Sequence, residues 1–379
     1  MLSCLPVSTL EIKHDEPLKP YTTFKIGGPA KLFASPRTVA EYRQCFEFAR
    51  HEGVPFHVLA GGSNTLVSDR GFDGLVIHPA QRGIAVTSQT RTSCALRVAA
   101  AEAWDDVVQY AVEHEWWGIE NLSHIPGQAG AALVQNIGAY GQQMSDTLTS
   151  AEVLEVFTGE VREVPAENCG LGYRRSIFNS SEKNRYLILS VSLSLSRQEK
   201  PNLSYPDVGA YFEQRGDLAP SISQIREAII AIRDRKFPFP REEKGGNAGS
   251  FFKNLQIGEA DFRTLQKAVQ KNFPRPIQER LKEFRKRYVG PGPIKIPTAF
   301  LIEICGLKGR RIGNAQVNEI QPLVLLNLGG ATADDVMTLA GEVRRTVRER
   351  TGMALSLEPE LLGFSLEEAA TYLNLKQSS

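Results

Sequence analysis

The chain has 379 residues, a formal net charge of +1, 42% hydrophobic residues and 23% charged residues. This balance is typical of a globular protein with two or three domains, and it argues against a broad nucleic-acid-binding face, although not against a local basic pocket. No apolar run approaches the ~20 residues that a membrane-spanning helix needs. The N-terminal residues also lack the basic and then apolar pattern of a signal peptide.

The cysteine and histidine patterns argue against a metal site. The five cysteines are widely scattered, and no two of them form a Cys-x-x-Cys pair, so we expect neither a disulfide framework nor a zinc site. The six histidines show no His-x-x-His or His-Glu-x-x-His grouping. A reducing cytoplasm fits this cysteine usage best.

The first half of the chain is predicted to alternate between helices and short strands. Residues 1–20 are predicted to form an arm, and a turn follows at Gly27-Gly28-Pro29. Apolar residues at near-helical spacing predict helices over 38–52 and 104–115, with Gly53 ending the first. Alternating patterns predict strands at 54–59, 74–77, 96–100, 151–157, 161–164 and 186–195.

The second half contains longer helices and a predicted domain boundary. The composition becomes polar and proline-containing near Gln198–Asp207, where we place the boundary. Helices are predicted over 222–235, 260–272 and 332–350, the last beginning with a weak capping box. The charged segment 276–288 is also compatible with a helix, a strand is predicted at 353–357, and the last residues are predicted to fray.

Two glycine-rich loops are the first functional feature. One runs from Ala60 to Val67 after an apolar run, and the other runs from Ile125 to Gly141. Glycine lets a ligand approach the backbone closely, and exposed amides in such turns bind anions. We interpret the two loops as gripping one phosphorylated cofactor. The alternative is that both are tight turns packed in a core. No Walker loop or G-x-G-x-x-G motif occurs, so neither a P-loop nor a Rossmann site is supported.

A serine, an arginine and a glutamate could carry chemistry. Ser250 lies in the glycine-rich segment 245–254 and could be a nucleophile, a proton donor, a phosphate ligand or a structural loop serine. Arg174 lies among apolar residues and is expected to have a carboxylate or phosphate partner. That partner could belong to a ligand, or it could be a carboxylate of the protein in a structural salt bridge. Glu358 and Glu360 point to the same face of an extended chain. One of them could act as an acid or base, or both could be solvated.

Two further features have simpler explanations beside the functional ones. His124 precedes the second glycine loop and could contact a ligand, although a hydrogen-bonded structural role is the simpler explanation. The segment 280–287 mixes both charge signs and is typical of a solvated helix face, with binding of a nucleotide phosphate as the alternative.

Six segments, taken together, resemble the UDP-N-acetylenolpyruvoylglucosamine reductase family, also called UDP-N-acetylmuramate dehydrogenases. They occur in the family's order between about Tyr21 and Gly363. The segments are TTFKIGGPA (from Thr22), LAGGSNTLV (from Leu59), ENLSHIPGQAGAALVQNIGAYG (from Glu120), GYRRSIF (from Gly172), GNAGSFFKN (from Gly246) and LEPE (from Leu357). Ala131-Ala132 departs from the serines or glycines of some members, and the charged segment 268–290 is longer than in the shorter members.

The resemblance implies an α+β fold with an FAD-binding domain of the vanillyl-alcohol-oxidase (PCMH) type. That domain is expected at 21–197, in two α+β subdomains at about 21–78 and 79–197. A C-terminal α+β substrate-binding domain is expected at 198–364, after an N-terminal arm at 1–20 and before a tail at 365–379.

The resemblance also implies an activity and a set of site residues. The activity is the NADPH-dependent reduction of the enolpyruvyl ether of UDP-N-acetylglucosamine to UDP-N-acetylmuramate in peptidoglycan precursor synthesis. Non-covalent FAD would deliver hydride to C3, Ser250 would protonate C2, Arg174 would stabilise the developing charge and Glu360 would polarise or orient the carboxylate. Cofactor contacts are expected from Gly61, Gly62, Ser63, Asn64, Thr65, Ile125, Pro126, Gly127, Gly130, Ala131, Asn136, Gly138, Ala139, Tyr140 and Gly141. Substrate contacts are expected from Tyr205, Lys236, Asn254 and Gln321.

Two other functions remain as alternatives. One is a different FAD-dependent oxidase or dehydrogenase of the same cofactor fold, although the loop 61–65 lacks the histidine through which many of those enzymes attach flavin. The other is a non-catalytic protein that binds FAD or a UDP-sugar. We expect a monomer that binds a small nucleotide-sugar, with no metal, nucleic-acid or membrane partner.

Overall fold

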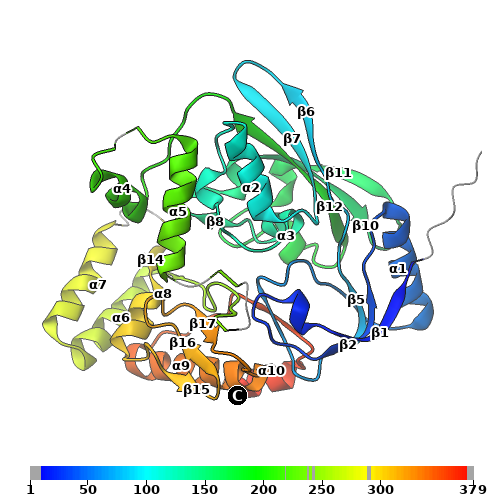
Figure 1. Cartoon of the computed structure of the whole chain (residues 1–379). Coiled ribbons are helices and arrows are strands. Elements are labelled where there is room, and N and C mark those ends of the chain that lie inside the picture. The colour runs from blue at the N-terminus through cyan, green and yellow to red at the C-terminus, as the bar shows by residue number, and fades with distance from the viewer. Residues whose placement is uncertain (1–9, 218, 237–238, 241–243, 288–291, 374–379) are drawn as a thin grey trace, which may run out of the picture. The chain divides into compact units, whose positions relative to one another are not determined.

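The computed structural model describes residues 10–217, 219–236, 239–240, 244–287 and 292–373 (Figure 1). The contacts within the chain divide it into two compact units. The first unit comprises Met1–Glu16, Ala30–Gly61 and Asp73–Arg235, and the second comprises Pro17–Pro29, Gly62–Phe72 and Lys236–Ser379. Among the described residues, no helix combines the length and the apolar character that a membrane crossing requires.

A four-stranded sheet and one helix form the N-terminal part of the first unit. In pairing order the strands are β1 (Ile12–Pro17), β2 (Pro29–Ala34), β5 (Phe72–Ile77) and β3 (Phe56–Val58). Helix α1 (Val39–Glu52) begins at Thr38, whose side chain accepts a hydrogen bond from the Glu41 amide, and ends at Gly53 in the left-handed conformation. Its buried face includes Tyr42 and Phe46, one turn apart, and packs on the sheet.

An antiparallel five-stranded sheet is the centre of the first unit (Figure 1). In pairing order its strands are β11 (Val161–Pro165), β10 (Leu148–Glu155), β12 (Tyr186–Ser196), β7 (Ser93–Ala99) and β6 (Ile84–Gln89). The register pairs Val191 with both Ala151 and Val98, so apolar side chains from three strands line up across one face. That face is buried and carries the core on which the helices of this unit pack.

Four helices share this core. They are α2 (Trp104–Glu113), α3 (Ala129–Val134), α4 (Pro206–Glu213) and α5 (Ile222–Lys236). Trp104 is 1% exposed, and its indole nitrogen donates to the Leu122 carbonyl at 3.1 Å. Val208 of α4 and Ile229 of α5 are fully buried in the same cluster. The core therefore extends the first unit well beyond the last strand of the sheet.

The second unit is mainly helical, with three small sheets. Its helices are α6 (Glu259–Asn272), α7 (Arg275–Arg287), α8 (Thr298–Ile304), α9 (Ala333–Thr351) and α10 (Leu366–Tyr372). The paired strands are β13 (Leu255–Ile257) with β14 (Ile294–Ile296), β15 (Arg311–Ile312) with β16 (Ala315–Val317) and β17 (Leu325–Asn327), and β4 (Thr65–Val67) with β18 (Glu360–Leu362). Helix α9 begins with the predicted capping box of Thr332 and Asp335.

Short elements complete the described chain. The second glycine loop contains a small hairpin of β8 (Gly138–Ala139) and β9 (Gln142–Gln143). Single 3-10 turns lie at η1 (Lys19–Tyr21), η2 (Glu120–Leu122), η3 (Met144–Asp146), η4 (Ala166–Cys169) and η5 (Ile177–Asn179).

Three sequence-based predictions differ from the structure at the two ends of the chain. Residues 353–357 are extended and alternate between buried and exposed side chains, but only Leu357 forms a bridge. The predicted strand is therefore wrong, because this alternation indicates one buried side and not a neighbouring strand. Within the predicted tail, α10 is a helix capped by Ser365, while residues 374–379 lie outside the described residues. Within the predicted arm, β1 is a strand because Ile12 packs on the core, and residues 1–9 lie outside the described ones.

The division by contacts also differs from the predicted boundary at 197/198. The polar stretch at 198–207 is a connecting loop, but α4 and α5 follow it and bury their apolar faces in the core of the first unit. The first unit consequently ends at Arg235, and two N-terminal segments belong to the second unit.

Candidate functional site

The two glycine loops meet in the first unit. A β-carbon placed on Gly61 would lie 2.7 Å from the α-carbon of Gly127 and 3.3 Å from the nitrogen of Gln128. Real β-carbons do not approach backbone atoms this closely, so the contact requires glycine at position 61. Segments that are more than sixty residues apart in the sequence are thus joined backbone to backbone, as the interpretation of a shared binding site requires.

Hydrogen-bond donors are available along this contact. Among the described residues, no acceptor is found for the backbone amides of Gly61, Ile125, Gly127 and Gln128. The side-chain oxygen Oε1 of Gln128 is also buried without a hydrogen-bond partner in the described part of the chain. Buried polar groups are normally satisfied, and clustered amides form anion-binding concavities. These groups therefore fit a phosphorylated ligand that supplies both acceptors and a donor.

Some of the predicted cofactor residues support this loop through packing. A β-carbon on Gly130 would lie 2.8 Å from the Ala100 β-carbon, and the Gly130 amide already donates to the Ala100 carbonyl at 2.9 Å. Gly138 and Ala139 pair with β9 in the small hairpin, and Ala131 is half-buried in α3. The amide of Gly130 is therefore engaged inside the protein and holds α3 in place.

The remainder of the first loop belongs to the second unit. Gly62 has φ +56°, and a β-carbon there would lie 2.2 Å from the carbonyl oxygen of Tyr21. Ser63 and Asn64 are half-buried, and Thr65 begins β4. The glycine at position 62 is therefore required both by its backbone conformation and by close packing.

Left-handed backbone conformations gather at the second glycine loop. Among the described residues, eight non-glycine residues have positive φ, and four of these are His124 (+61°), Asn136 (+40°), Tyr140 (+47°) and Arg174 (+52°). Such conformations cost about 1–3 kcal/mol each and persist where the surrounding structure imposes them, often at functional sites. Because four of them lie in or near the second glycine loop, the surrounding structure must hold the backbone of this part of the first unit in an unfavourable conformation, as is common at functional sites.

Arg174 is attached directly to the second glycine loop. Its Nη2 donates to the Gly138 carbonyl at 3.3 Å, and its guanidinium carbon lies 5.6 Å from the centre of the Tyr173 ring. Asn136 Nδ2 donates to the Gly172 carbonyl at 2.9 Å, and Asn136 Oδ1 accepts from the Ser145 amide at 3.0 Å. Asn136, predicted as a cofactor contact, thus uses its side chain to hold the Arg174 loop against the glycine loop.

His124 lies in a network of charged side chains in the first unit. Its Nε2 is 2.9 Å from Asp234 Oδ1, and its backbone amide donates to Asp105 at 2.5 Å. Arg226 binds Asp105 with two hydrogen bonds of 2.7 and 2.9 Å. Burial acts to raise the pKa of Asp105, but the bonds from Arg226 and from the His124 amide outweigh it, so this pKa lies below its ordinary value. The structural explanation of His124 therefore agrees with the contacts found.

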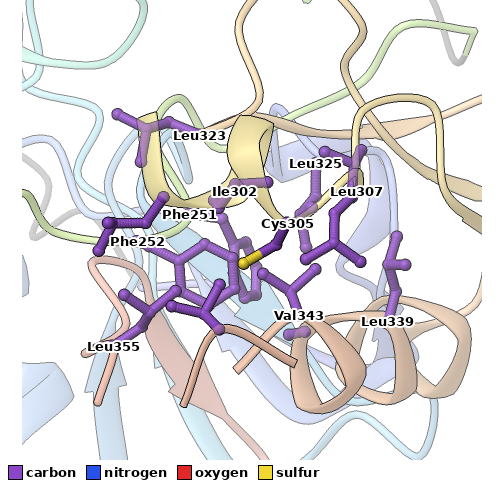
Figure 2. Packing of buried hydrophobic residues seen from close by; sticks show 14 of the residues in the cluster. Phe251, Phe252, Ile302, Cys305, Leu307, Leu323, Leu325, Leu339, Val343 and Leu355 are labelled. Atoms are coloured by element: carbon purple, nitrogen blue, oxygen red, sulfur yellow. The ribbon is translucent and has the colours of Figure 1, made fainter. Parts of the chain in front are cut away.

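Ser250 lies on a rigid segment of the second unit. It forms a bridge with Val324, and the amide of the next residue, Phe251, donates to the Leu323 carbonyl at 2.7 Å. Phe251 and Phe252 are fully buried, and Figure 2 shows both rings among the side chains of the core around α8 and α9. Two buried aromatic anchors thus fix the backbone immediately after a half-buried serine.

Two buried asparagines that the sequence analysis missed shape the loop before Ser250. Asn247 Nδ2 donates to the Gly245 carbonyl at 2.9 Å, and Asn247 Oδ1 accepts from the Gly249 amide at 3.0 Å. The backbone nitrogen and carbonyl of Asn327 pair with Gly246 and Gly245 at 2.8 and 2.7 Å. Both asparagines are 1% exposed or less. Two asparagines that each bind neighbouring backbone groups give the glycine-rich loop one defined shape.

Replacing Asn327 with leucine is expected to lower the free energy of unfolding by roughly 3 kcal/mol, because the amides of Gly329 and Ala331 and the Phe24 carbonyl would lose their buried partner. Urea denaturation of the whole chain measures this change. The matched control is Asn272→Leu, which removes one exposed bond to the Arg350 carbonyl. Equal destabilisation by the two variants would contradict the role of Asn327 as the buried hydrogen-bond partner of these backbone groups.

Glu360 lies beside the Ser250 segment. The Glu358 amide donates to the Phe251 carbonyl at 3.0 Å, and the Glu360 amide donates to the Asn64 carbonyl at 2.9 Å. Asn64 Nδ2 in turn donates to the Glu358 carbonyl at 3.2 Å. Both glutamates are half-buried. The second unit therefore brings together the serine and glutamate segments on which the sequence analysis placed the chemistry.

The other predicted substrate contacts are divided between the units. Lys236 and Gln321 meet at Asn318, which donates to the Lys236 carbonyl at 2.9 Å and accepts from the Gln321 amide at 3.3 Å. Asn254 Oδ1 accepts from the Thr298 amide at 3.0 Å, at the start of α8. These residues are in the second unit, whereas Tyr205 is in the first.

Comparison with known proteins identifies the family. A family model described as "UDP-N-acetylenolpyruvoylglucosamine reductase, C-terminal domain" matches residues 240–362, and a second model, described as "FAD binding domain", matches residues 30–165. A UDP-N-acetylenolpyruvoylglucosamine reductase from Pseudomonas aeruginosa is 38% identical over 353 residues, which is 93% of this chain and 99% of that protein. One from Flavobacterium johnsoniae is 35% identical over 354 residues, covering 93% of this chain and all of that protein.

A solved structure agrees with this result. The crystal structure of UDP-N-acetylenolpyruvylglucosamine reductase from Thermus caldophilus is similar with a TM-score of 0.59 and 25% identity, over 93% of this chain and 98% of that chain. The prediction of an α+β fold with an FAD-binding domain and a C-terminal domain is confirmed. The chain belongs to the UDP-N-acetylenolpyruvoylglucosamine reductase family, whose members are FAD-dependent oxidoreductases.

Proposed function

We propose that the protein reduces the enolpyruvyl ether of UDP-N-acetylglucosamine to UDP-N-acetylmuramate, a step of peptidoglycan precursor synthesis, with NADPH as the electron donor. The observation that carries the proposal is the hydrogen-bonded pairing of the Ser250 and Glu360 segments in a protein with an FAD-binding domain. A hydroxyl and a carboxyl group on adjacent rigid segments can supply a proton and, through a hydrogen bond, orient a carboxylate group at one double bond.

The proposed roles follow from the chemistry of each side chain. When bound, FAD supplies hydride transfer from NADPH to C3 of the enolpyruvyl group. Arg174 stabilises the negative charge that develops on C2 and the carboxylate, because a guanidinium matches a carboxylate in shape and charge. Glu360 polarises or orients that carboxylate through a hydrogen bond. Ser250 then donates a proton to C2, so that hydride and proton together reduce the carbon–carbon double bond.

The nucleotide-sugar is proposed to contact Tyr205, Lys236, Asn254 and Gln321. A lysine and two amide side chains suit a diphosphate and a sugar, which present many oxygen acceptors. Asn318 binds the backbone of both Lys236 and Gln321 and so holds these two residues near each other.

Mass spectrometry of the reaction products tests the proposed function. With NADPH and the enolpyruvyl ether, we expect a product that has gained two hydrogens while NADPH is consumed in equal amount. Consumption of NADPH with oxygen, and with the sugar nucleotide unchanged, would favour the alternative of an oxidase of the same cofactor fold.

The loop contact gives a prediction for flavin binding. Gly61→Ala is expected to weaken flavin binding at least about tenfold, or about 1.4 kcal/mol, because the new methyl group must push the Gly127 backbone away. Flavin fluorescence during titration of the apoprotein measures the dissociation constant. Gly258→Ala is the control, because a β-carbon there meets nothing within 4 Å. An unchanged constant for Gly61→Ala would exclude the loop contact from flavin binding.

A further inference from the structure

The loop that carries Tyr205 is tied to the second glycine loop by a buried side chain. Asn121, which is completely buried, donates from Nδ2 to the Tyr140 carbonyl at 2.7 Å and to the Asn202 carbonyl at 2.9 Å. One amide group thus joins two loops that are about sixty residues apart in the sequence. Both loops are in the first unit.

Two further contacts strengthen this link. Asn202 Nδ2 donates back to the Gly141 carbonyl at 2.9 Å, and the Tyr205 ring lies edge-to-face on the Tyr140 ring, with centres 5.2 Å apart. Asn202 Oδ1 also accepts from the Ser204 hydroxyl at 2.6 Å, which shapes the turn before Tyr205. Tyr205 remains 39% exposed, whereas Tyr140 is 7% exposed. The loop therefore presents one aromatic ring outward while its backbone is held at Tyr140 and Gly141.

The orientation of the Asn121 amide is determined by its surroundings. Its NH₂ group faces two carbonyl oxygens, and the reversed orientation would place an oxygen against both of them. Its backbone amide donates to Gln142 Oε1 at 2.8 Å, and Gln142 Nε2 donates to Glu120 Oε1 at 2.6 Å. Burial raises the pKa of the Glu120 carboxyl. A buried polar network thus holds the asparagine rigidly.

We propose that Asn121 and Asn202 form a clasp that positions Tyr205 for substrate and couples this tyrosine to the second glycine loop. The inference rests on the proposed function, because it takes Tyr205 as a substrate contact and the glycine loop as a cofactor contact. Asn121 and Asn202 are positioning residues. Loss of the clasp frees the Tyr205 loop without changing the groups that react.

Hydrogen exchange and steady-state kinetics of the holoprotein test the clasp. In Asn121→Ser and in Asn202→Ala we expect faster amide exchange in peptides covering residues 198–212. We also expect a KM for the sugar nucleotide about three- to tenfold higher, as the loss of a hydrogen bond between the two loops implies, with kcat and flavin content nearly unchanged. The double variant should show a larger rise than either single variant, because the side chains of Asn121 and Asn202 make separate hydrogen bonds between the same two loops.

The control is Asn272→Ala, an exposed asparagine whose Nδ2 also donates to a backbone carbonyl. Unchanged exchange at 198–212 in both single variants would overturn the proposal. Loss of flavin in step with the rise in KM would also overturn it, because it would show a general structural role. Exchange does not depend on turnover, so it decides on the clasp even if the wild-type protein converts no substrate, a result that would instead refute the proposed function.

Discussion

Ser250→Ala is expected to slow the reoxidation of NADPH-reduced flavin by the enolpyruvyl substrate by a factor of ~10²–10⁴, the usual contribution of a positioned general acid. The reduction of flavin by NADPH should keep its rate, because that step needs no proton at C2 of the substrate. The backbone at Ser250 should stay in place, because the next residue is anchored by the buried ring of Phe251 and by the hydrogen bond from the Phe251 amide to the Leu323 carbonyl. Anaerobic stopped-flow absorbance follows the two half-reactions separately.

The control for this experiment is Ser356→Ala, at an exposed serine whose carbonyl accepts from the Lys253 amide. This variant should behave as the wild type in both half-reactions. If Ser250→Ala slowed both halves by the same factor, the serine would be a binding or structural residue, and the proton would have to come from another group.

Arg174→Ala is expected to slow the same reoxidation step by ~10²–10³, because it removes a preorganised positive charge from the developing negative charge. Its left-handed backbone adds little to this effect, since arginine and alanine pay a similar strain at φ +52°. Arg174→Lys should recover only part of the rate, because lysine lacks the planar fork that binds a carboxylate at two points. Single-turnover absorbance after anaerobic reduction gives the rate.

Arg175→Ala is the matched control for Arg174→Ala. Arg175 is the next residue and is exposed, whereas Arg174 is half-buried and bonded to Gly138. We expect Arg175→Ala to change the rate by less than about twofold, as for a solvated charge. An equal loss of rate in the two variants would mean that net charge, and not the placement of Arg174, affects the reaction.

Features encoded by local patterns could be predicted from the sequence. The predicted helix over 38–52 is found at Val39–Glu52 and ends at Gly53 as predicted, because the chemistry that ends a helix lies within a few residues. The helix at 333–351 follows the same rule. Ser250 and Glu360 could be proposed as site residues because the six family segments occur in order, although the pairing of their segments in one unit could not be read from spacing alone.

The sequence analysis missed three residues whose roles depend on burial. Asn121, Asn247 and Asn327 are buried asparagines that bind backbone groups, and no local pattern distinguishes them from exposed asparagines. Burial also explains why the first unit does not end at the predicted boundary of 197/198. The polar stretch before α4 suggested the end of a domain, but Val208 and Ile229, which follow it, are buried in the core of the first unit. The strand predicted at 353–357 failed for a related reason, because pairing depends on a partner segment elsewhere in the chain.

Anaerobic absorbance of the flavin-loaded protein tests the central claim most directly. NADPH is added to bleach the oxidised flavin band, and the enolpyruvyl ether of UDP-N-acetylglucosamine is then added without oxygen. We predict that the oxidised band returns promptly and that UDP-N-acetylmuramate forms in equal amount. A band that stays bleached until oxygen is admitted would contradict the proposed substrate and would point to an oxidase built on the same cofactor fold.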